Sequence, residues 1–359
     1  MARCSWRSAG CSLGRPKQHS TKTVRLGFSP YTYARVAVMR SFLLKKEDYD
    51  RILKMGVHEL LRFLQETHYK QEFDDYHVLS EGTASIEAAF HANLGRSIQK
   101  LYTISDAAMK QVLGAYLLRY DMENIKMILR SKAAGLPSAS VEPLLYSSVN
   151  YGSEFLQMLL SRKSVEEVAS SLSFFKKGYG ALNTTDTDLF SMENALDHYY
   201  VQTVEDFAKN LRGQGVFMSS LMKQEINFLN IRTILRLLAS QGKITPSDIG
   251  KYLITPSSFI KKLAEKSGVV DVVKELHRHK MTSLTGDEPD LLTKLEIDLT
   301  VAILRRAALL SHQHVLSANS ILSYLFAKET EVNNLKTILK GKKLEIRPEY
   351  LEPLLVIAK

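Results

Sequence analysis

The sequence lacks long apolar runs and is poor in proline, glycine and cysteine. No uninterrupted apolar run among the 359 residues approaches the ~18 needed to cross a bilayer, which argues against an integral membrane protein. Nine prolines and 18 glycines are few for this length and disfavour a turn-dense all-β fold. Cys4 and Cys11 are the only cysteines. A disulfide framework or cysteine metal site is therefore excluded from the body of the chain, as is typical of a reducing cytoplasmic setting.

Acidic residues are absent before Glu47, whereas this N-terminal stretch holds ten basic residues. They account for the whole formal charge of +10, because without them 38 Lys and Arg remain against 38 Asp and Glu. A protein that follows phosphates needs a basic face on its folded body. We therefore predict no nucleic-acid partner. We interpret residues 1–25 as a disordered basic leader or the product of a mis-set start codon, with a targeting segment as a weaker alternative.

One heptapeptide recurs three times. Each copy consists of Asn, Ile or Leu, a basic residue, a variable residue, Ile, Leu and a second basic residue, and the copies are 106 and 104 residues apart. The copies begin at Asn124, Asn230 and Asn334. A polar or acidic residue lies three positions before each asparagine: Asp121, Asn227 and Glu331. Repetition at this distance predicts an internally repeated fold.

Two further landmarks keep the same order and spacing. In one, a valine is followed by an acid two positions on and a leucine seven positions on; the valines are Val57, Val165 and Val269. In the other, an apolar residue precedes a glutamate; the glutamates are Glu87, Glu193 and Glu296. The glutamates precede the asparagines by 37, 37 and 38 residues. These spacings predict a repeat of ~105 residues, with boundaries near 26–137, 138–245 and 246–359.

Apolar residues recur at helical spacing from each glutamate landmark onward. The three apolar faces are Ile86, Phe90, Leu94, Ile98 and Leu101; Met192, Leu196, Tyr200, Val204 and Phe207; and Leu295, Leu299, Ile303, Ala307 and Leu310. Convincing strand alternation is lacking, so we predict an all-α fold with about four helices per repeat. A repeat of ~105 residues exceeds the ~20–50 of a solenoid unit. We expect three similar helical domains arranged as a funnel around a pseudo-threefold axis.

Several helix starts are marked by capping signals. Ser164 with Glu167 predicts a capping box, and Thr245 before Pro246 with Asp248 predicts an N-cap followed by proline at the first helical position. Thr103 with Asp106 predicts the start of the helix that runs to Arg130, and Thr255 before Pro256 repeats part of the Thr245 signal. Glycines after the repeated asparagines, Gly135, Gly242 and Gly341, predict that each asparagine helix ends near them.

Recognisable catalytic motifs are missing. The sequence has no phosphate-binding loop, zinc-helix motif or nucleophile elbow. His277 with His279, and His312 with His314, are separated by two positions, which places them on different faces of a helix and disfavours a metal site. The carboxylate pairs Asp74–Asp75 and Asp186–Asp188, and the motif Gly178-Tyr179-Gly180, are best explained as solvated loop features. We predict no catalytic residue, metal or cofactor.

The repeated asparagines and glutamates are the best candidates for special roles. Asn124 lies at the border of the apolar face of its helix. Its side-chain amide can be held by Asp121, or can hydrogen-bond to a backbone carbonyl of a neighbouring segment. A catalytic residue is rarely needed three times in one chain. We therefore predict that Asn124, Asn230 and Asn334 are structural anchors. We predict the same for Glu87, Glu193 and Glu296, each as a partner for a basic residue across the repeat.

These repeats resemble a known family. The asparagine heptapeptides, the glutamate helix starts and the opening Tyr31-Thr32-Tyr33-Ala34-Arg35, with Leu43, Leu44, Tyr49 and Leu53, are similar to the C subunit of archaeal and bacterial A/V-type ATP synthases. The related eukaryotic protein is the d subunit of the vacuolar proton pump (V-ATPase). The resemblance covers about residues 26–359, whereas the basic, cysteine-containing leader departs from the family pattern.

The resemblance implies a non-catalytic central-stalk subunit on the cytoplasmic face of the membrane. It would link the membrane rotor ring to the shaft subunits D and F, and so couple proton or sodium transport to ATP synthesis or hydrolysis. Two other hypotheses stay open. One is a helical nucleic-acid-binding protein that uses the leader; the other is an all-helical enzyme with an axial active site.

Overall fold

The computed structural model describes residues 30–76, 83–146, 148–172, 189–210, 215–286, 291–313 and 318–357. Within these ranges the chain forms seventeen α-helices and two short 3₁₀ segments and contains no strand. The protein is therefore all-α, as predicted. The helices are more numerous than the dozen expected, because short ones such as α7 and α17, of four residues each, leave little periodicity in the sequence.

The described helices belong to two compact units. The first unit comprises Tyr116–Tyr200, and the second comprises the described residues of 22–115 and 201–359. Helices of the first unit are α6 (Ala107–Ala133, from Tyr116 onward), α7 (Ser138–Val141), η1 (Glu142–Leu144), α8 (Gly152–Leu160), α9 (Val165–Ser171) and the first part of α10 (Leu189–Lys209).

The second unit contains two stretches of chain separated by the first unit. Its N-terminal helices are α1 (Pro30–Ser41), α2 (Lys46–Lys54), α3 (Val57–Gln65), α4 (Lys70–Asp75) and α5 (Thr83–Ile104). Its C-terminal elements are α11 (Gly215–Gln241), α12 (Pro246–Tyr252), α13 (Ser258–Ala264), α14 (Val269–Arg278), α15 (Leu291–Gln313), α16 (Ala318–Lys343), α17 (Pro348–Leu351) and η3 (Glu352–Leu354).

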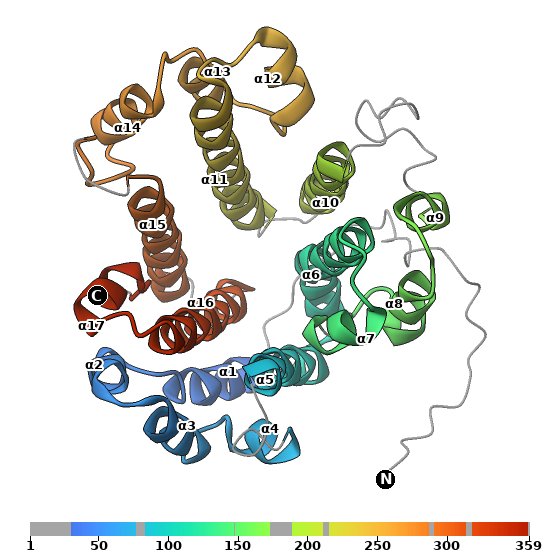
Figure 1. Ribbon diagram of the computed structural model, residues 1–359, viewed down its shortest axis with the longest axis vertical. Coiled ribbons are helices and arrows are strands. Elements are labelled where there is room, and N and C mark those ends of the chain that lie inside the picture. The colour runs from blue at the N-terminus through green and yellow to red at the C-terminus, as the bar shows by residue number, and fades with distance from the viewer. Residues whose placement is uncertain are drawn as a thin grey trace. The chain divides into compact units, whose positions relative to one another are not determined.

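Helix α16 packs against the N-terminal helices of the second unit. It contacts α1, α3 and α5, and α17 contacts α2 (Figure 1). The Arg40 guanidinium of α1 donates to the Ser323 hydroxyl at 2.8 Å. The Lys342 ammonium donates to the carbonyls of Leu53 and Met55, where α2 ends. Segments almost 300 residues apart in the chain thus form one packed group.

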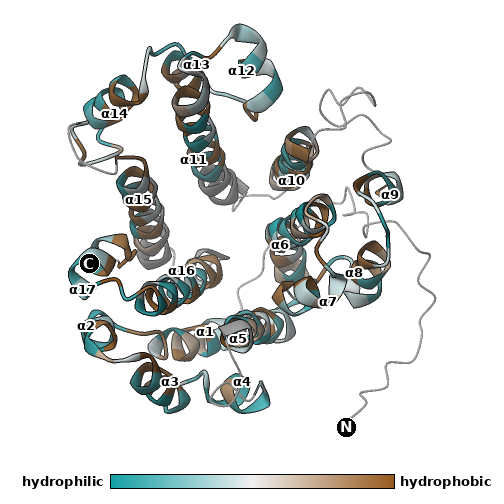
Figure 2. Ribbon diagram, in the orientation of Figure 1, coloured by the Kyte–Doolittle hydropathy of each residue, from teal (hydrophilic) through white to brown (hydrophobic). Residues whose placement is uncertain are grey.

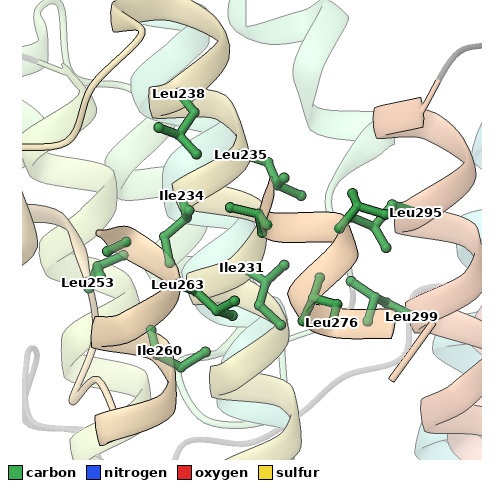
Figure 3. Close-up of a cluster of buried hydrophobic side chains, with 13 residues drawn as sticks. Ile231, Ile234, Leu235, Leu238, Leu253, Ile260, Leu263, Leu276, Leu295 and Leu299 are labelled. Carbon is green, nitrogen blue, oxygen red and sulfur yellow. The ribbon is translucent and has the colours of Figure 1, made fainter. Parts of the chain in front are cut away.

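Helices α11 to α15 share a hydrophobic core. Ile231 and Ile234 of α11 are fully buried against Ile260 and Leu263 of α13, and Leu276 of α14 closes the cluster (Figure 3). Leu295 and Leu299 of α15 join the same cluster. Burying such aliphatic side chains contributes about 1.5–3 kcal/mol each, so this core holds α11 to the helices that follow it.

The predicted helical faces are confirmed wherever their side chains are described. All five apolar residues of the face in α5 and all five in α10 are buried, as are Leu295 and Leu299 of α15. The side chains of Ile303, Ala307 and Leu310 lie outside the described set. Figure 2 shows hydrophobic and hydrophilic residues distributed around the same helices, as amphipathic packing requires.

The helix start that the Ser164 cap predicts at Val165 is confirmed, because α9 begins there, and the other two valine landmarks, Val57 and Val269, also begin helices, α3 and α14. The leucines seven positions on, Leu64, Leu172 and Leu276, are buried. The Thr245 cap is also confirmed: its hydroxyl accepts from the Asp248 N–H, and Pro246 opens α12.

Other predicted helix starts need correction. Asp106 caps α6 by accepting from the Met109 N–H at 2.7 Å, whereas Thr103 lies within α5 and donates to the Gln99 carbonyl. Ser257 caps α13, whereas Thr255 adopts a positive φ of 37° in the preceding bend. In both cases two candidate caps lie close together in the sequence, and the true cap is the one directly before the first helical turn.

Two smaller predictions also need correction. The Ser164 hydroxyl accepts from the Glu167 N–H at 3.3 Å, but the Glu167 carboxylate accepts from the Lys163 N–H rather than from the Ser164 N–H. The N-cap is therefore present without the reciprocal half of the box. Asp74 and Asp75 end helix α4 rather than lying in a loop, and both are exposed.

Candidate functional site: three asparagine junctions

Each repeated asparagine clamps the backbone of a segment that follows its helix. The Asn124 amide donates to the Tyr146 carbonyl at 2.9 Å, and its carbonyl oxygen accepts from the Tyr146 N–H at 2.8 Å. Asn230 makes the same pair with Ile254 at 2.8 and 2.8 Å. Asn334 makes it with Val356 at 2.9 and 3.0 Å. The three junctions are chemically equivalent.

The clamp suits asparagine because its side chain copies the donor and acceptor of a peptide group. All three asparagines are at most 3% exposed, so water is excluded from the paired groups. A net contribution of about 0.5–1.5 kcal/mol per hydrogen bond is typical, whereas an unpaired buried backbone group costs about 1–3 kcal/mol. Losing one side chain therefore leaves two backbone groups unsatisfied at once.

The clamped segments carry a repeat of their own that the sequence analysis missed. Glu-Pro-Leu-Leu precedes Tyr146 as residues 142–145 and precedes Val356 as residues 352–355. In both places a short α-helix, α7 or α17, leads into a 3₁₀ turn. The second copy has α12 instead, and its clamped residue lies 24 positions after the asparagine rather than 22. The repeated tetrapeptide was the signal that could have identified the partner segments.

The residue three positions before the asparagine differs among the junctions. Asp121 is 1% exposed, and its Oδ2 accepts from the Asn150 amide at 2.7 Å. It therefore supports the segment beyond Tyr146 instead of holding Asn124. The second copy has Asn227, which is half-buried. The third has Glu331, which is 3% exposed.

Glu331 lies at the centre of a buried network. Its Oε1 accepts from the Tyr69 hydroxyl at 2.7 Å and from the Lys328 ammonium at 2.6 Å, and its Oε2 accepts from the Leu44 N–H at 2.6 Å. The Lys328 ammonium also lies 4.2 Å from the centroid of the Tyr69 ring. Burial and then the Glu331 charge raise the pKa of Tyr69. This network connects α16 to both the α1–α2 turn and the start of α4.

The glutamates of two copies meet basic residues six positions after an asparagine. Arg130 makes a bidentate pair with Glu193 at 2.6 and 2.7 Å within the first unit. Lys340 lies 3.5 Å from Glu87 within the second unit. Both basic side chains are more than half exposed, so each pair contributes little to stability. The side chain of Glu296 lies outside the described set.

A second cross-helix pair lies one turn away. Lys126 contacts Asp197 at 2.6 Å, and Lys336 contacts the His91 Nε2 at 2.7 Å. Burial lowers the pKa of Lys126, but the carboxylates of Asp197 and Glu123 outweigh this effect and raise the pKa above its ordinary value. Burial, together with Lys340, lowers the pKa of Lys336 to about 8. Burial and the Lys336 charge lower the pKa of His91 to about 3. Lys126 and Lys336 occupy the same repeat position, but one pairs with a carboxylate and the other with an imidazole.

The described residues show no grouping of three histidine, cysteine, aspartate or glutamate side chains that could hold a metal ion. His277 and His279 are exposed, and His279 faces Glu275 at 3.5 Å. The side chains of His312 and His314, the pair Asp186–Asp188, the motif 178–180 and the leader 1–25 lie outside the described residues. Among the described helices, none has the length and apolar character required to cross a membrane.

The described residues thus form an all-α protein in which three buried asparagines clamp the backbone of the segment that follows their helix. Over residues 32–353 the sequence matches the family described as ATP synthase (C/AC39) subunit. The chain belongs to this family, which confirms the resemblance inferred from its repeats.

Relatives match over nearly the full chain. The C subunit of the A-type ATP synthase from Methanosarcina mazei is 32% identical over 358 residues, covering 96% of this chain and 97% of that protein. The C subunit from Methanococcoides burtonii is 32% identical over 347 residues, covering 91% and 94%. That of Haloferax volcanii is 28% identical over 343 residues, covering 91% and 97%.

Proposed function

We propose that this chain is a non-catalytic central-stalk subunit of an A/V-type rotary ATP synthase. In this role it links the membrane rotor ring to the shaft subunits D and F at the cytoplasmic face of the membrane. Transport of protons or sodium ions is thereby coupled to ATP synthesis or hydrolysis. The observation that carries the proposal is the family match over residues 32–353, together with relatives of similar length that are named as the C subunit of A-type ATP synthases.

The connectivity of the chain supports an arrangement of three helical groups around a common axis. Each group is built on one asparagine helix: α6 with α7–α10, α11 with α12–α15, and α16 and α17 with α1–α5. The chain runs from α5 into the first group, then into the second, and returns through α16 to the helices where it began. The covalent links therefore form a closed cycle, and a cyclic set of like groups is what a socket for a shaft requires.

The junctions supply the stiffness that torque transmission needs. Backbone clamps, buried aliphatic cores and ion pairs all connect helices within a group, so that a load applied to one helix is shared by its neighbours. This role demands packing rather than chemistry. These three groups do not begin and end at the repeat boundaries 26–137, 138–245 and 246–359. Those boundaries describe the repeat in the sequence, and they stay a prediction.

Co-purification from membranes tests the proposal. A tagged copy of the full chain, expressed in its own host, is extracted in mild detergent, and its partners are identified by mass spectrometry. We expect subunits D and F and the ring subunit in stoichiometric amounts. Recovery of the chain without any other ATP synthase component would contradict the proposal.

A leader deletion serves as the control for the nucleic-acid hypothesis. Removal of residues 1–23 leaves the described helices intact, so we expect the same set of ATP synthase partners. Nucleic acid that co-purifies in a salt-sensitive manner, and that is lost with the leader, would support the competing hypothesis instead.

A further inference from the structure

The first junction contains a buried acid that the clamp does not use. Asp121 is 1% exposed, and only one of its carboxylate oxygens has a partner in the structure: Oδ2 accepts from Asn150, whereas Oδ1 is buried without a hydrogen bond. The hydroxyl of Tyr151 is also buried, and burial, Tyr199 and then the Asp121 charge raise the pKa of Tyr151. Buried polar atoms without partners are uncommon in native proteins and point to a missing proton or ligand.

The acid is connected to the segment that Asn124 clamps. Asn150 lies four positions after Tyr146, and Ser148 between them also hydrogen-bonds to Asp121. The Ser148 hydroxyl accepts in turn from the N–H groups of Tyr151 and Gly152, where α8 begins. The charge state of Asp121 therefore acts on residues 148–152, which follow closely after the residue that Asn124 clamps, Tyr146.

Within the described part of the chain, Ser148 and Asn150 are the side chains that shift the pKa of Asp121, and no charged side chain does so. Two phenols belong to the same region: the Asp121 charge raises the pKa of Tyr151, which directly precedes α8, and Tyr199 of α10 hydrogen-bonds to Tyr151. The charged groups on the same helices are engaged elsewhere. On α6 and α10, Lys126 pairs with Glu123 and Asp197. Arg119 of α6 lies over the rings of Tyr116 and Tyr120.

We propose that Asp121 is a proton-operated switch that tightens residues 148–152, together with the clamped Tyr146, onto α6 when protonated and loosens them when ionised. The neutral acid removes a buried charge and supplies a donor at Oδ1, where the ionised form has an unpaired acceptor. The other two copies differ at the corresponding position, since Asn227 carries no charge and Glu331 is paired with Lys328. The switch is therefore specific to the first junction. It does not depend on the proposed function of the chain.

The direction of the pH effect follows from burial. Burial raises the pKa of Asp121 from 3.8 to about 6, although hydrogen bonds from Ser148 and Asn150 oppose the change. A raised carboxyl pKa stabilises the closed segment fully below pH 3.8, and that contribution is lost as the pH rises through about 6. From these values the opening equilibrium increases about tenfold between about pH 5 and about pH 7.5.

Amide hydrogen exchange of the full chain tests the switch. The readout is the protection factor of the Tyr146 N–H, corrected for intrinsic exchange, at about pH 5 and about pH 7.5. We expect an approximately tenfold loss of protection in the wild type and none in Asp121→Asn, which introduces the residue type of position 227. The Val356 N–H, clamped by Asn334 in the same way, is the internal control. Equal pH dependence at Tyr146 in the wild type and in Asp121→Asn would overturn the proposal.

A direct titration covers the case in which Asp121→Asn fails to fold. Carbon-13 NMR of aspartate-labelled wild-type protein follows the Asp121 carboxyl. A midpoint near pH 6 supports the switch, whereas a midpoint near the ordinary value of 3.8 overturns it.

Discussion

The junctions at Asn124 and Asn334 share one clamp but surround it with different chemistry. In both, a buried asparagine pairs with the backbone of a residue 22 positions later. Three residues earlier, however, the first junction has an acid with one unpaired oxygen, whereas the third has an acid paired with Lys328, Tyr69 and the Leu44 N–H. The clamp bonds only the backbone of its partner residue, so it does not depend on the side chain there. It is therefore the same in both junctions, whereas the side-chain contacts around it differ.

The difference also reflects what each junction must hold. Glu331 connects α16 to the α1–α2 turn and to the start of α4, which lie more than 250 residues away in sequence. Asp121 supports a stretch only 29 residues away. Bringing together distant chain ends carries a larger loop-closure entropy cost, and the third junction has the denser network of buried contacts to offset it.

Breaking the shared clamp is expected to have the largest effect. Asn334→Asp replaces the amide donor with an oxygen that faces the Val356 carbonyl, and either a buried charge or an unsatisfied pair results. We expect a loss of about 4 kcal/mol in the free energy of unfolding, measured by urea denaturation, and a similar loss for Asn230→Asp. Asn333→Asp, one residue earlier and exposed, is the matched control and should change stability by less than about 0.5 kcal/mol. Equal effects at positions 333 and 334 would contradict the clamp.

The buried charge network of the third junction is the next test. Glu331→Gln leaves the Lys328 ammonium buried without its counter-charge, and we expect a loss of about 3 kcal/mol. Lys328→Gln combined with Glu331→Gln removes both charges and places Gln, the residue type of position 224 in the second copy, at position 328. Because removal of a whole buried pair costs less than removal of one partner, the double variant should be more stable than Glu331→Gln alone. A strictly additive double variant would show that the two charges are not coupled.

Packing against the clamped segment distinguishes the two junctions further. Gly341 lies so close to Leu351 that a Cβ at position 341 would overlap the leucine side chain. The corresponding first-copy residues are Ser131 and Val141, a larger residue on the helix and a smaller one on the segment. Gly341→Ala should therefore cost about 2 kcal/mol. Adding Leu351→Val, which imitates the first copy, should recover at least half of that loss in thermal unfolding; no recovery would indicate that the clash is not with Leu351.

The smallest expected effect concerns the helix ends. Gly135 has a φ of 66°, and the corresponding Glu345 has a φ of 55°. Both helices end with the same hydrogen bond, from Leu136 N–H to Ser131 carbonyl and from Ile346 N–H to Gly341 carbonyl, each at 2.9 Å. A non-glycine residue in this conformation is strained, so Glu345→Gly should stabilise the protein by about 1 kcal/mol, while Gly135→Ala should destabilise it by a similar amount. Opposite signs in chemical denaturation are the diagnostic result.

Periodic features of the molecule could be predicted from the sequence. The buried faces of α5 and α10 and the three repeated asparagines follow from spacing, and the helix start at Val165 follows from the Ser164 cap. Spacing reports which residues share a helix face, and burial of that face follows from the hydrophobic effect.

Partners across long distances could not be predicted in the same way. Nothing in the local sequence around Glu331 identifies Tyr69 or Leu44 as its partners, because those contacts depend on how α16 packs against the N-terminal helices. The backbone partners of the asparagines could have been predicted from the sequence, because the Glu-Pro-Leu-Leu repeat precedes two of them. Short helices such as α7 and α17 were missed because four residues complete hardly more than one turn.

Distances among the three copies test the central claim most directly. Arg130, Arg236 and Lys340 occupy the same repeat position and are exposed, and Cys4 and Cys11 can be replaced by serine. Spin labels placed in pairs at the three positions, through cysteine substitutions, allow the three separations to be measured by pulsed electron paramagnetic resonance. Three copies around a shared axis predict three similar distances. One distance close to the sum of the other two would mean that the copies are strung out in a line, and it would contradict the account.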